Sequence, residues 1–328
     1  MKFFITGGTG FIGEGLINRL LNEGKEVVAL CRSDKGLMEK EGLAWKKGSL
    51  EDADSLIRAM EGCTHVFHCA GLARLWDPDT EAFFRVNVKG TENILAAASY
   101  HDVEKLVYTS TAGVLGRSLS SPISEEDPRL EPFDNDYDLT KYLAEERVRE
   151  YAAGGRQAVI VSPSRVYGPG TLSQSNSVTK TLVNYIRQNF YLVPGNGAPR
   201  SNYVFVDDVV EGHMLAMQKG APGEKFTLGG ENLSYNELYE QFKMVTGLER
   251  RRISIPAGAI TLGAYTMMGW TRISGRPPVI TPWFAKRLFH DRMLSIEKAE
   301  SVLGYRATPM KEALSRTLEF LGYEPVKT

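Results

Sequence analysis

The sequence predicts an α/β protein built on a doubly wound parallel sheet, with a smaller C-terminal lobe. Two observations predict this fold. Short apolar segments alternate with segments of helical periodicity through the first half of the chain, and a glycine-rich turn joins the first such pair. A chain of 328 residues is long enough for one such sheet and a second lobe.

The turn after the first apolar segment carries glycines spaced by three. Residues 2–5 read Lys-Phe-Phe-Ile, residues 6–13 read Thr-Gly-Gly-Thr-Gly-Phe-Ile-Gly, and leucines and isoleucines then recur at helical spacing. Glycines let backbone N–H groups approach a pyrophosphate, and the N-terminus of the next helix adds unpaired donors and a positive dipole end. The order of strand, turn and helix therefore predicts a dinucleotide site. Its expected members are Gly7, Thr9, Gly10, Phe11, Ile12 and Gly13.

Apolar segments of strand type recur before residue 165. We expect strands at 2–5, 26–31, 44–47, 64–69, 105–110 and 157–162, and long helices at 83–100 and 137–153. Such alternation predicts a parallel sheet of the Rossmann type, covered by helices on both faces. We expect residues 1–165 to form a dinucleotide-binding Rossmann domain, with a later strand near 203–206 returning to its sheet. Residues 166–328 are expected to form mainly a substrate-binding lobe.

Composition excludes several classes of function. The net charge of −1 gives no electrostatic case for binding nucleic acid or an anionic membrane. Cys31, Cys63 and Cys69 form no CxxC pair and predict reduced thiols in a cytoplasmic protein, with no leader segment at the N-terminus. The five histidines are too scattered for a metal site, so none is expected.

The longest apolar stretch, residues 255–270, is shorter than a membrane span, and we expect a buried or lid helix there rather than contact with a membrane. Apolar and aromatic side chains in and after this stretch are interpreted either as a cover over an apolar substrate or as ordinary core. They are Tyr265, Met267, Met268, Trp270, Trp283 and Phe284.

Groups suited to acid–base chemistry lie in the middle of the chain. The fifth predicted strand ends in hydroxyls, including Ser110 and Thr111, at the sheet edge where open α/β sheets bind ligands. Tyr137 and Lys141 are spaced to share one face of a helix. A phenol titrates near 10, and a nearby ammonium lowers that pKa, so the pair suits proton exchange with a carbonyl held by a strand-end hydroxyl.

With these motifs in order, the chain resembles an extended short-chain dehydrogenase/reductase of the NAD-dependent epimerase/dehydratase superfamily. It is most similar to the dihydroflavonol-reductase-like branch, including the hopanoid-associated sugar-epimerase type. The segments that carry the resemblance are 6–13, 68–71, 87–93, 109–116, 163–170 and 206–209, with the Tyr137/Lys141 pair; 72–76 and 227–232 suggest the branch.

The resemblance implies roles for individual residues. Tyr137 would be the catalytic acid/base, and Lys141 would lower its pKa and bind the nicotinamide ribose. The family's strand-end hydroxyl falls on Thr111, with Ser110 as the alternative. Where the family often has Asp against the adenine, this chain has Ser49. The remaining cofactor contacts that the resemblance implies are Leu50, Ala70, Pro163 and Val166.

The end of the second strand bears on the choice of cofactor. NAD enzymes usually place a carboxylate there, on the ribose 2′-hydroxyl. Here the position is Cys31, followed by Arg32, which can bind a 2′-phosphate with a charge-assisted fork, and Lys35 can add to it. Asp34 is the counterargument, because a small loop shift would bring it to the ribose. The sequence favours NADP over NAD.

Three functions remain open. The first is an NADP(H)-dependent oxidoreductase that reduces a ketone or aldehyde. The second is a nucleotide-sugar epimerase or dehydratase, in which Arg187, Arg200 or residues 250–252 would hold the diphosphate of a sugar substrate. The third, a non-catalytic sensor of NADP, is disfavoured because Tyr137 and Lys141 are both present. All three bind small molecules, and the resemblance implies a homodimer.

Overall fold

The computed structural model describes residues 1–33, 37–74 and 76–326 and is built around a seven-stranded sheet in which every neighbouring pair is parallel. The strand order is β10-β6-β5-β4-β1-β2-β3. Their bounds are β1 Lys2–Thr6, β2 Glu26–Cys31, β3 Leu43–Lys47, β4 His65–His68, β5 Lys105–Thr109, β6 Ala158–Pro163 and β10 Lys225–Leu228. The order reverses between β1 and β4, which creates the crevice where such sheets bind ligands.

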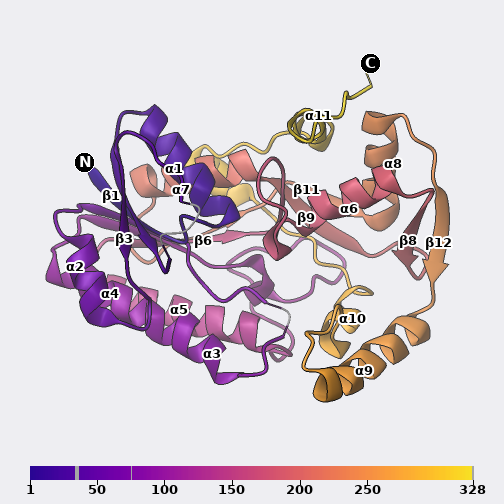
Figure 1. Ribbon diagram of the computed structural model, residues 1–328, viewed down its shortest axis with the longest axis horizontal. Helices are drawn as coiled ribbons and strands as arrows, with labels where there is room; N and C mark the ends of the chain where they lie inside the picture. Colours follow the sequence, from indigo (N-terminus) through magenta and orange to yellow (C-terminus); the bar gives the residue numbers. More distant parts are fainter. Residues whose placement is uncertain (34–36, 75, 327–328) are drawn as a thin grey trace.

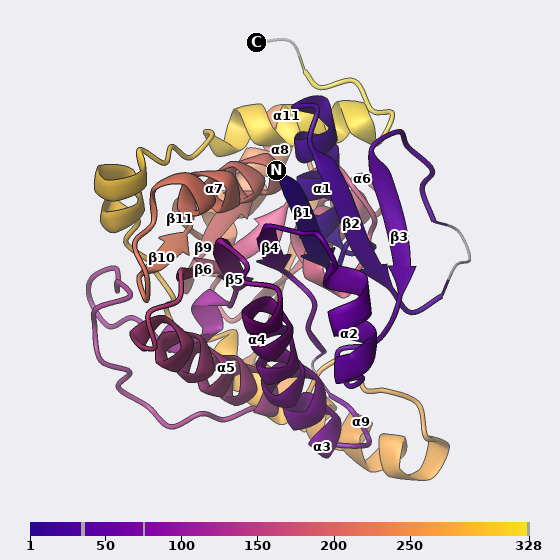
Figure 2. The same cartoon turned by 90° about the vertical axis from the view of Figure 1, so that its left-hand side faces the viewer.

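Helices cover both faces of this sheet (Figures 1 and 2). One face carries α1 (Phe11–Asn22) and α7 (Val206–Lys219), and the other carries α2 (Ala53–Met60), α4 (Gly90–Tyr100) and α5 (Asp136–Ala153). Consecutive strand residues point to opposite faces, so Phe3 belongs to one apolar cluster and Phe4 to the other. The predicted doubly wound α/β fold is confirmed.

The helix expected at 83–100 is interrupted. It consists of α3 (Glu81–Phe83), the π-helical turn η1 (Phe84–Lys89) and α4. Such π-turns are rare and occur frequently at functional sites, because the wider turn redirects one side chain. Here the buried residue of the π-turn is Asn87, whose contacts are described below.

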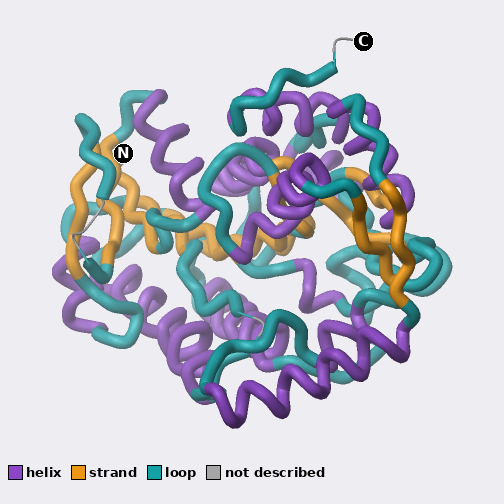
Figure 3. The backbone as a smooth tube through the Cα atoms, turned by 45° about the vertical axis from the view of Figure 1, so that its right-hand side comes forward, coloured by secondary structure: helices purple, strands orange, loops and turns teal. Residues whose placement is uncertain are grey.

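The C-terminal half adds two small sheets to one side of the large one (Figures 1 and 3). One contains β7 (Arg165–Tyr167), β9 (Arg200–Phe205) and β11 (Glu231–Ser234), and the other pairs β8 (Phe190–Pro194) with β12 (Arg251–Ile255). The helices of this half are α6 Ser177–Arg187, α8 Tyr235–Thr246, α9 Ala257–Ser274, α10 Pro282–Arg287 and α11 Met310–Phe320. Short helical turns complete the chain: η2 Ala112–Leu115, η3 Gln174–Asn176 and η4 Ala299–Leu303.

The strand that returns to the large sheet is not the predicted one. The stretch near 203–206 belongs to β9, which pairs with β7 and β11 outside the large sheet. The returning strand is β10, which pairs with β6. The sequence does not predict this strand, because Lys225 interrupts its apolar pattern at a buried position. The buried charge of Lys225 is neutralised by the Glu145 carboxylate.

Helix α9 is largely exposed, so the expectation of a buried helix at residues 255–270 is wrong, and that of a lid helix stays a prediction. Among its residues only Ala264 and Thr271 are buried, and most of its apolar side chains face solvent. Tyr265, Met267 and Trp270 are exposed and therefore neither core nor substrate cover. Within the described part of the chain, no helix has the length and apolarity to cross a membrane.

Helix α5 is attached to the sheet by a buried ion pair. The Glu145 carboxylate accepts from the Lys225 ammonium of β10 at 2.9 Å, and the two side chains are 1% and 7% exposed. The Ser110 hydroxyl donates to the same carboxylate at 2.5 Å, and Arg149 donates at 3.2 Å. The pair therefore fixes α5 to an edge strand and to the end of β5.

Replacing this carboxylate is expected to destabilise the protein. Glu145→Gln leaves the buried Lys225 charge without its partner, which costs about 3 kcal/mol of unfolding free energy in urea. Glu146→Gln is the matched control, because Glu146 is half-exposed and, among the described residues, pairs with Arg149 alone, and we expect a loss below about 1 kcal/mol. Equal losses in the two variants would contradict this account.

Candidate active site

The glycine turn between β1 and α1 has no room for side chains. Gly7 has φ +74°, and a Cβ on it would lie 2.8 Å from the Ala70 nitrogen. A Cβ on Gly13 would collide with the Gly7 carbonyl oxygen. The Gly10 N–H closes the turn on that oxygen at 2.8 Å. Because Gly10 ends the turn without a side-chain cap, the first N–H groups of α1 stay available, as a bound pyrophosphate requires.

The end of β4 is tied to this turn by a buried hydrogen-bond chain. The Ala70 N–H donates to the Thr6 hydroxyl at 3.1 Å, and that hydroxyl is bonded to His68 Nδ1 at 2.7 Å. His68 Nε2 in turn meets the Thr91 hydroxyl at 3.1 Å. Burial and the nearby Lys141 charge lower the pKa of His68 to about 3, so the imidazole is neutral. His68 therefore positions Ala70 beside Gly7.

The segment after β6 closes over the start of α1. Pro163 ends β6, and Val166 is a buried residue of β7. The segment continues to Gly170, which has φ +137° and whose Cβ would lie 2.9 Å from the Phe11 ring. The structure thus brings the glycine turn at 6–13 and the segment 163–170 together, although these two predicted cofactor segments are far apart in sequence.

The adenine side of the crevice is only partly described. Arg32 is exposed directly after β2. Ser49 and Leu50 follow β3, and Asn93 donates to the Leu50 carbonyl at 2.8 Å, which fixes their loop against α4. Lys35 and Asp34, which bear on the choice of cofactor, lie outside the described residues.

Tyr137 lies near Thr111 at the start of α5. Asn135 caps α5 by accepting from the Asp138 N–H at 2.8 Å, so Tyr137 lies in the first turn of the helix. A hydrogen bond with the Thr111 side chain lowers the pKa of Tyr137, but desolvation and the Asp138 charge outweigh it and raise that pKa to about 12. The sequence predicted a lowered pKa, and the direction is opposite because desolvation is the larger effect.

Lys141 lies one turn further along α5 and is buried. Its ammonium donates to the Thr109 carbonyl at 2.6 Å and lies 4.1 Å from the centre of the Tyr108 ring. Burial lowers its pKa from 10.5 to about 7. A Cβ on Gly71 would lie 3.8 Å from its Nζ, so the segment after β4 borders the ammonium.

Ser110, the alternative to Thr111, is used elsewhere. Its hydroxyl donates to the buried Glu145 carboxylate, whereas the Thr111 hydroxyl accepts from the Gly113 N–H at 3.1 Å and lies near Tyr137. The neighbouring Thr109 hydroxyl is bonded to His213 at 2.8 Å. Of the strand-end hydroxyls, Thr111 is therefore the one placed for chemistry with Tyr137.

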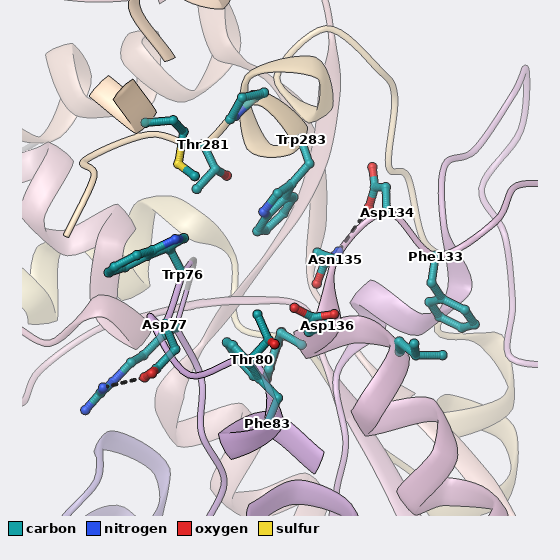
Figure 4. A pocket seen from close by; sticks show the side chains of 15 residues that line it. Trp76, Asp77, Thr80, Phe83, Phe133, Asp134, Asn135, Asp136, Thr281 and Trp283 are labelled. Carbon is teal, nitrogen blue, oxygen red and sulfur yellow. Dashed lines mark hydrogen bonds and ion pairs between the residues drawn. The ribbon is translucent and has the colours of Figure 1, made fainter. Parts of the chain in front are cut away.

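A cavity of about 390 Å³ opens beside Tyr137 (Figure 4). Trp76, from the loop before α3, and Trp283, from α10, both project into it. Its other lining residues are Arg74, Asp77, Thr80, Phe83, Phe133, Asp134, Asn135, Asp136, Leu139, Met268, Thr281 and Pro282. Met268 and Trp283, two of the residues considered for a substrate cover, thus line this cavity, and their role as a cover stays a prediction.

The sequence matches a known family over most of the sheet. The model of the "NAD dependent epimerase/dehydratase family" matches residues 3–229. The chain belongs to this family.

Individual relatives agree with that assignment. The chain is 32% identical to a putative dihydroflavonol 4-reductase of Synechocystis, covering 99% of this chain and 96% of the relative. It is 31% identical to a 2-alkyl-3-oxoalkanoate reductase of Stenotrophomonas maltophilia, covering 93% and 94%. The fold is similar to that of UDP-glucose 4-epimerase of Thermotoga maritima, with TM-score 0.81, 24% identity and coverage of 98% and 99%.

These findings confirm the resemblance and the enzyme class. The protein is an NAD(P)-dependent oxidoreductase of the extended short-chain dehydrogenase/reductase type, a family whose substrates are small molecules. The collisions that a Cβ at Gly7 or Gly13 would cause fit a backbone cradle for a nicotinamide dinucleotide. Among the described residues, no cluster of His, Cys, Asp or Glu has the arrangement of a metal site.

Two positioning residues were not predicted from the sequence. Asn87 accepts from the Leu72 N–H at 2.7 Å and donates to the Thr140 hydroxyl at 3.0 Å, so the π-turn joins the loop after β4 to α5. Arg287 of α10 pairs with the buried Asp138 at 3.0 Å. Asn87 stands in a motif that already carried the resemblance, whereas nothing local identifies Arg287 as the partner of a carboxylate 149 positions away.

Removing the buried lysine is expected to stabilise the fold. Lys141 has a pKa of about 7 in the folded protein and 10.5 as its ordinary value, so its burial destabilises the protein fully below pH 7 and not at all above 10.5. Lys141→Met should therefore raise the unfolding free energy by about 2–4 kcal/mol at pH 7. The gain should shrink as the pH rises toward 10.5.

The measurement is urea unfolding over a pH series. Lys89→Met is the control, because Lys89 is exposed on η1 and pairs only with Glu92. Its effect should be small at every pH. A gain for Lys141→Met that does not change with pH would show that packing, not the buried charge, causes it.

Proposed function

We propose that this protein reduces the ketone or aldehyde group of an apolar small molecule, with NADPH as the hydride source and Tyr137 as the proton donor. The observation that carries the proposal is the position of Tyr137. Its phenol lies near the Thr111 hydroxyl and lines the cavity, and its helix also carries Lys141 beside the segment after β4. The oxygen of a carbonyl group bound in the cavity can therefore accept hydrogen bonds from the hydroxyls of Tyr137 and Thr111.

The residues of the chain supply the proton and the alignment. A bound nicotinamide supplies hydride to the carbonyl carbon. The Tyr137 hydroxyl donates its proton to the carbonyl oxygen as that oxygen gains charge, and Thr111 Oγ1 holds the same oxygen in line. The carbonyl becomes an alcohol, and Tyr137 regains a proton from water. Lys141 keeps its hydrogen bond to the Thr109 carbonyl and has further N–H donors that would bind the nicotinamide ribose.

The pKa of Tyr137 supports the reductive direction. A phenol with a pKa of about 12 is protonated throughout the physiological range and is ready to donate. Oxidation of the alcohol needs the phenolate instead, and that form becomes abundant only as the pH approaches 12. Desolvation therefore keeps Tyr137 protonated near neutral pH, as the proton donor of the reductive step requires.

The charge of the cavity supports a carbonyl reductase over a nucleotide-sugar epimerase. Its lining contains the carboxylates of Asp77, Asp134 and Asp136 and a single guanidinium, Arg74, which already pairs with Asp77 at 2.9 Å. A diphosphate would meet net repulsion there. A neutral apolar ketone meets Trp76 and Trp283 and needs no counter-charge.

The arginines considered for a diphosphate have other partners. Arg200 pairs with Glu237 in the C-terminal half. Arg250 donates to the carbonyls of Tyr185 and Ile186, at the end of α6. None of the arginines considered for that role lines the cavity beside Tyr137. The electrostatic case for a sugar nucleotide is correspondingly weak.

Removing the Tyr137 hydroxyl is expected to stop turnover. Tyr137→Phe should lower kcat/KM for NADPH-dependent ketone reduction by about a thousandfold, because general acid catalysis is lost. Its affinity for NADPH should stay unchanged. Thr111→Val should lower kcat/KM less, by about tenfold to a hundredfold, because it removes one orienting hydrogen bond.

The assay follows NADPH absorbance against a panel of aliphatic and aromatic ketones. Tyr142→Phe is the control, since Tyr142 lies on the same helix, is exposed and is not among the residues that line the cavity. Full activity of Tyr137→Phe would refute the mechanism. Conversion of UDP-glucose to its epimer by the wild type, with no reduction of any ketone, would establish the epimerase alternative instead.

The choice of cofactor is tested at Arg32. We propose that this exposed guanidinium binds the 2′-phosphate of NADP, so Arg32→Glu should weaken NADPH relative to NADH by about a hundredfold in dissociation constants. Arg58→Glu, on the exposed side of α2, is the control of equal charge change. Tighter binding of NADH than NADPH by the wild type would contradict the proposal.

A further inference from the structure

The outer face of α9 is apolar and has no partner within the described chain. Leu262 is 66% exposed and Ile273 is 81% exposed, and they lie about three helical turns apart on one face. Tyr265 and Trp270, each 62% exposed, lie on the two flanks of that face. Cβ atoms on Gly258, Gly263 and Gly269 would meet nothing. Such exposure is unfavourable in water and marks an interaction surface.

The apolar surface continues along the strand before the helix. Leu192 of β8 and Ile253 of β12 are exposed register partners, and Phe190 of β8 is exposed beside Arg251. Figure 1 shows β12 leading directly into α9 along the edge of the molecule, away from the large sheet. The strand pair and the helix thus form one edge of the C-terminal half.

The charged side chains of residues 250–290, which include β12 and α9, are all basic. Residues 250–290 contain no aspartate or glutamate. Their basic residues are Arg250, Arg251, Arg252, Arg272, Arg276, Lys286 and Arg287. Arg272 and Arg276 follow the apolar face at the C-terminal end of α9, and Arg251 and Arg252 precede it on β12; all four are exposed. The apolar face is therefore bordered by cations.

We propose that α9 docks on the surface of a bilayer containing anionic phospholipid, with Leu262 and Ile273 inserted at the level of the acyl chains. Tyr265 and Trp270 would lie at the headgroup level, where amphipathic aromatic rings are favoured. The arginines at both ends would meet lipid phosphates. The helix lies on the membrane and does not cross it, in agreement with its length and composition.

Charge decides between this occupant and a second copy of the chain. A two-fold symmetric dimer through α9 would place each cationic border against its own copy. Like charges in such an interface are unfavourable, whereas an anionic lipid surface neutralises both borders. The same helix also lines the catalytic cavity through Met268, so docking would hold the cavity next to the bilayer.

Vesicle flotation tests the proposal without any turnover, so its result is independent of the proposed reaction. Wild-type protein should float with vesicles of phosphatidylcholine mixed with phosphatidylglycerol, and poorly with phosphatidylcholine alone. High salt should release it. Trp270 emission should shift to the blue on the mixed vesicles, and Trp270→Phe should remove that shift.

Two variants separate the apolar and the charged contributions. Leu262→Ser with Ile273→Ser, and Arg272→Glu with Arg276→Glu, should each lower the bound fraction by about tenfold or more. Leu119→Ser is the matched control, because Leu119 is 58% exposed and lies outside this edge. Thermal unfolding should be unchanged in all variants, since the altered side chains face solvent.

Three results would overturn the proposal. They are absence of wild-type binding to either vesicle, equal binding by the wild type and the Leu262/Ile273 variant, and a wild-type dimer that this variant converts to a monomer while no form binds vesicles. The last result would identify the edge as an interface between copies of the chain.

Discussion

The position of α5 is the constraint on which the site depends, and two buried carboxylates fix it. Glu145 joins the helix to β10 through Lys225, and Asp138 joins its first turn to α10 through Arg287. Both partners come much later in the chain, from the returning strand and from the C-terminal half. Tyr137 and Lys141 therefore reach their final positions only when both halves have assembled around the helix. Removing one partner of either pair lowers the free energy of unfolding strongly, because the remaining charge stays buried away from water.

Burial of this helix also explains the protonation of the site. A residue pattern alone suggests that an ammonium near a phenol lowers the pKa of the phenol. In the folded protein, desolvation acts on both groups and favours the uncharged form of each, raising the pKa of Tyr137 and lowering that of Lys141. Burial on α5 thus favours the protonated phenol of Tyr137 and the uncharged amine of Lys141. A site of low charge suits a neutral carbonyl, and the proton that Tyr137 carries is then the one the reaction needs.

The sequence predicted those parts of the molecule that local patterns specify. The strands β1 to β6, the glycine turn and the spacing of Tyr137 and Lys141 follow from apolar periodicity and turn chemistry. The strand β10 was missed because Lys225 breaks the apolar pattern, and its burial makes sense only beside Glu145. The π-turn at Asn87 was missed for a similar reason, since nothing in a helical pattern shows one extra residue in a turn. Arg287 was missed because pairing across 149 positions leaves no local sign.

Net charge was the least informative of the sequence observations, because it averages surfaces that the fold separates. The chain as a whole carries −1. The charged side chains of residues 250–290 are nevertheless all basic, and those of the cavity lining are three carboxylates and one guanidinium. The two surfaces meet at α9, whose Met268 faces the cavity while Leu262 and Ile273 face outward. An anionic group is thus attracted to the outside of this helix and repelled from its inside, whereas an apolar neutral molecule is accepted by both. The geometry that disfavours a sugar nucleotide in the cavity is therefore compatible with a substrate that partitions into lipid.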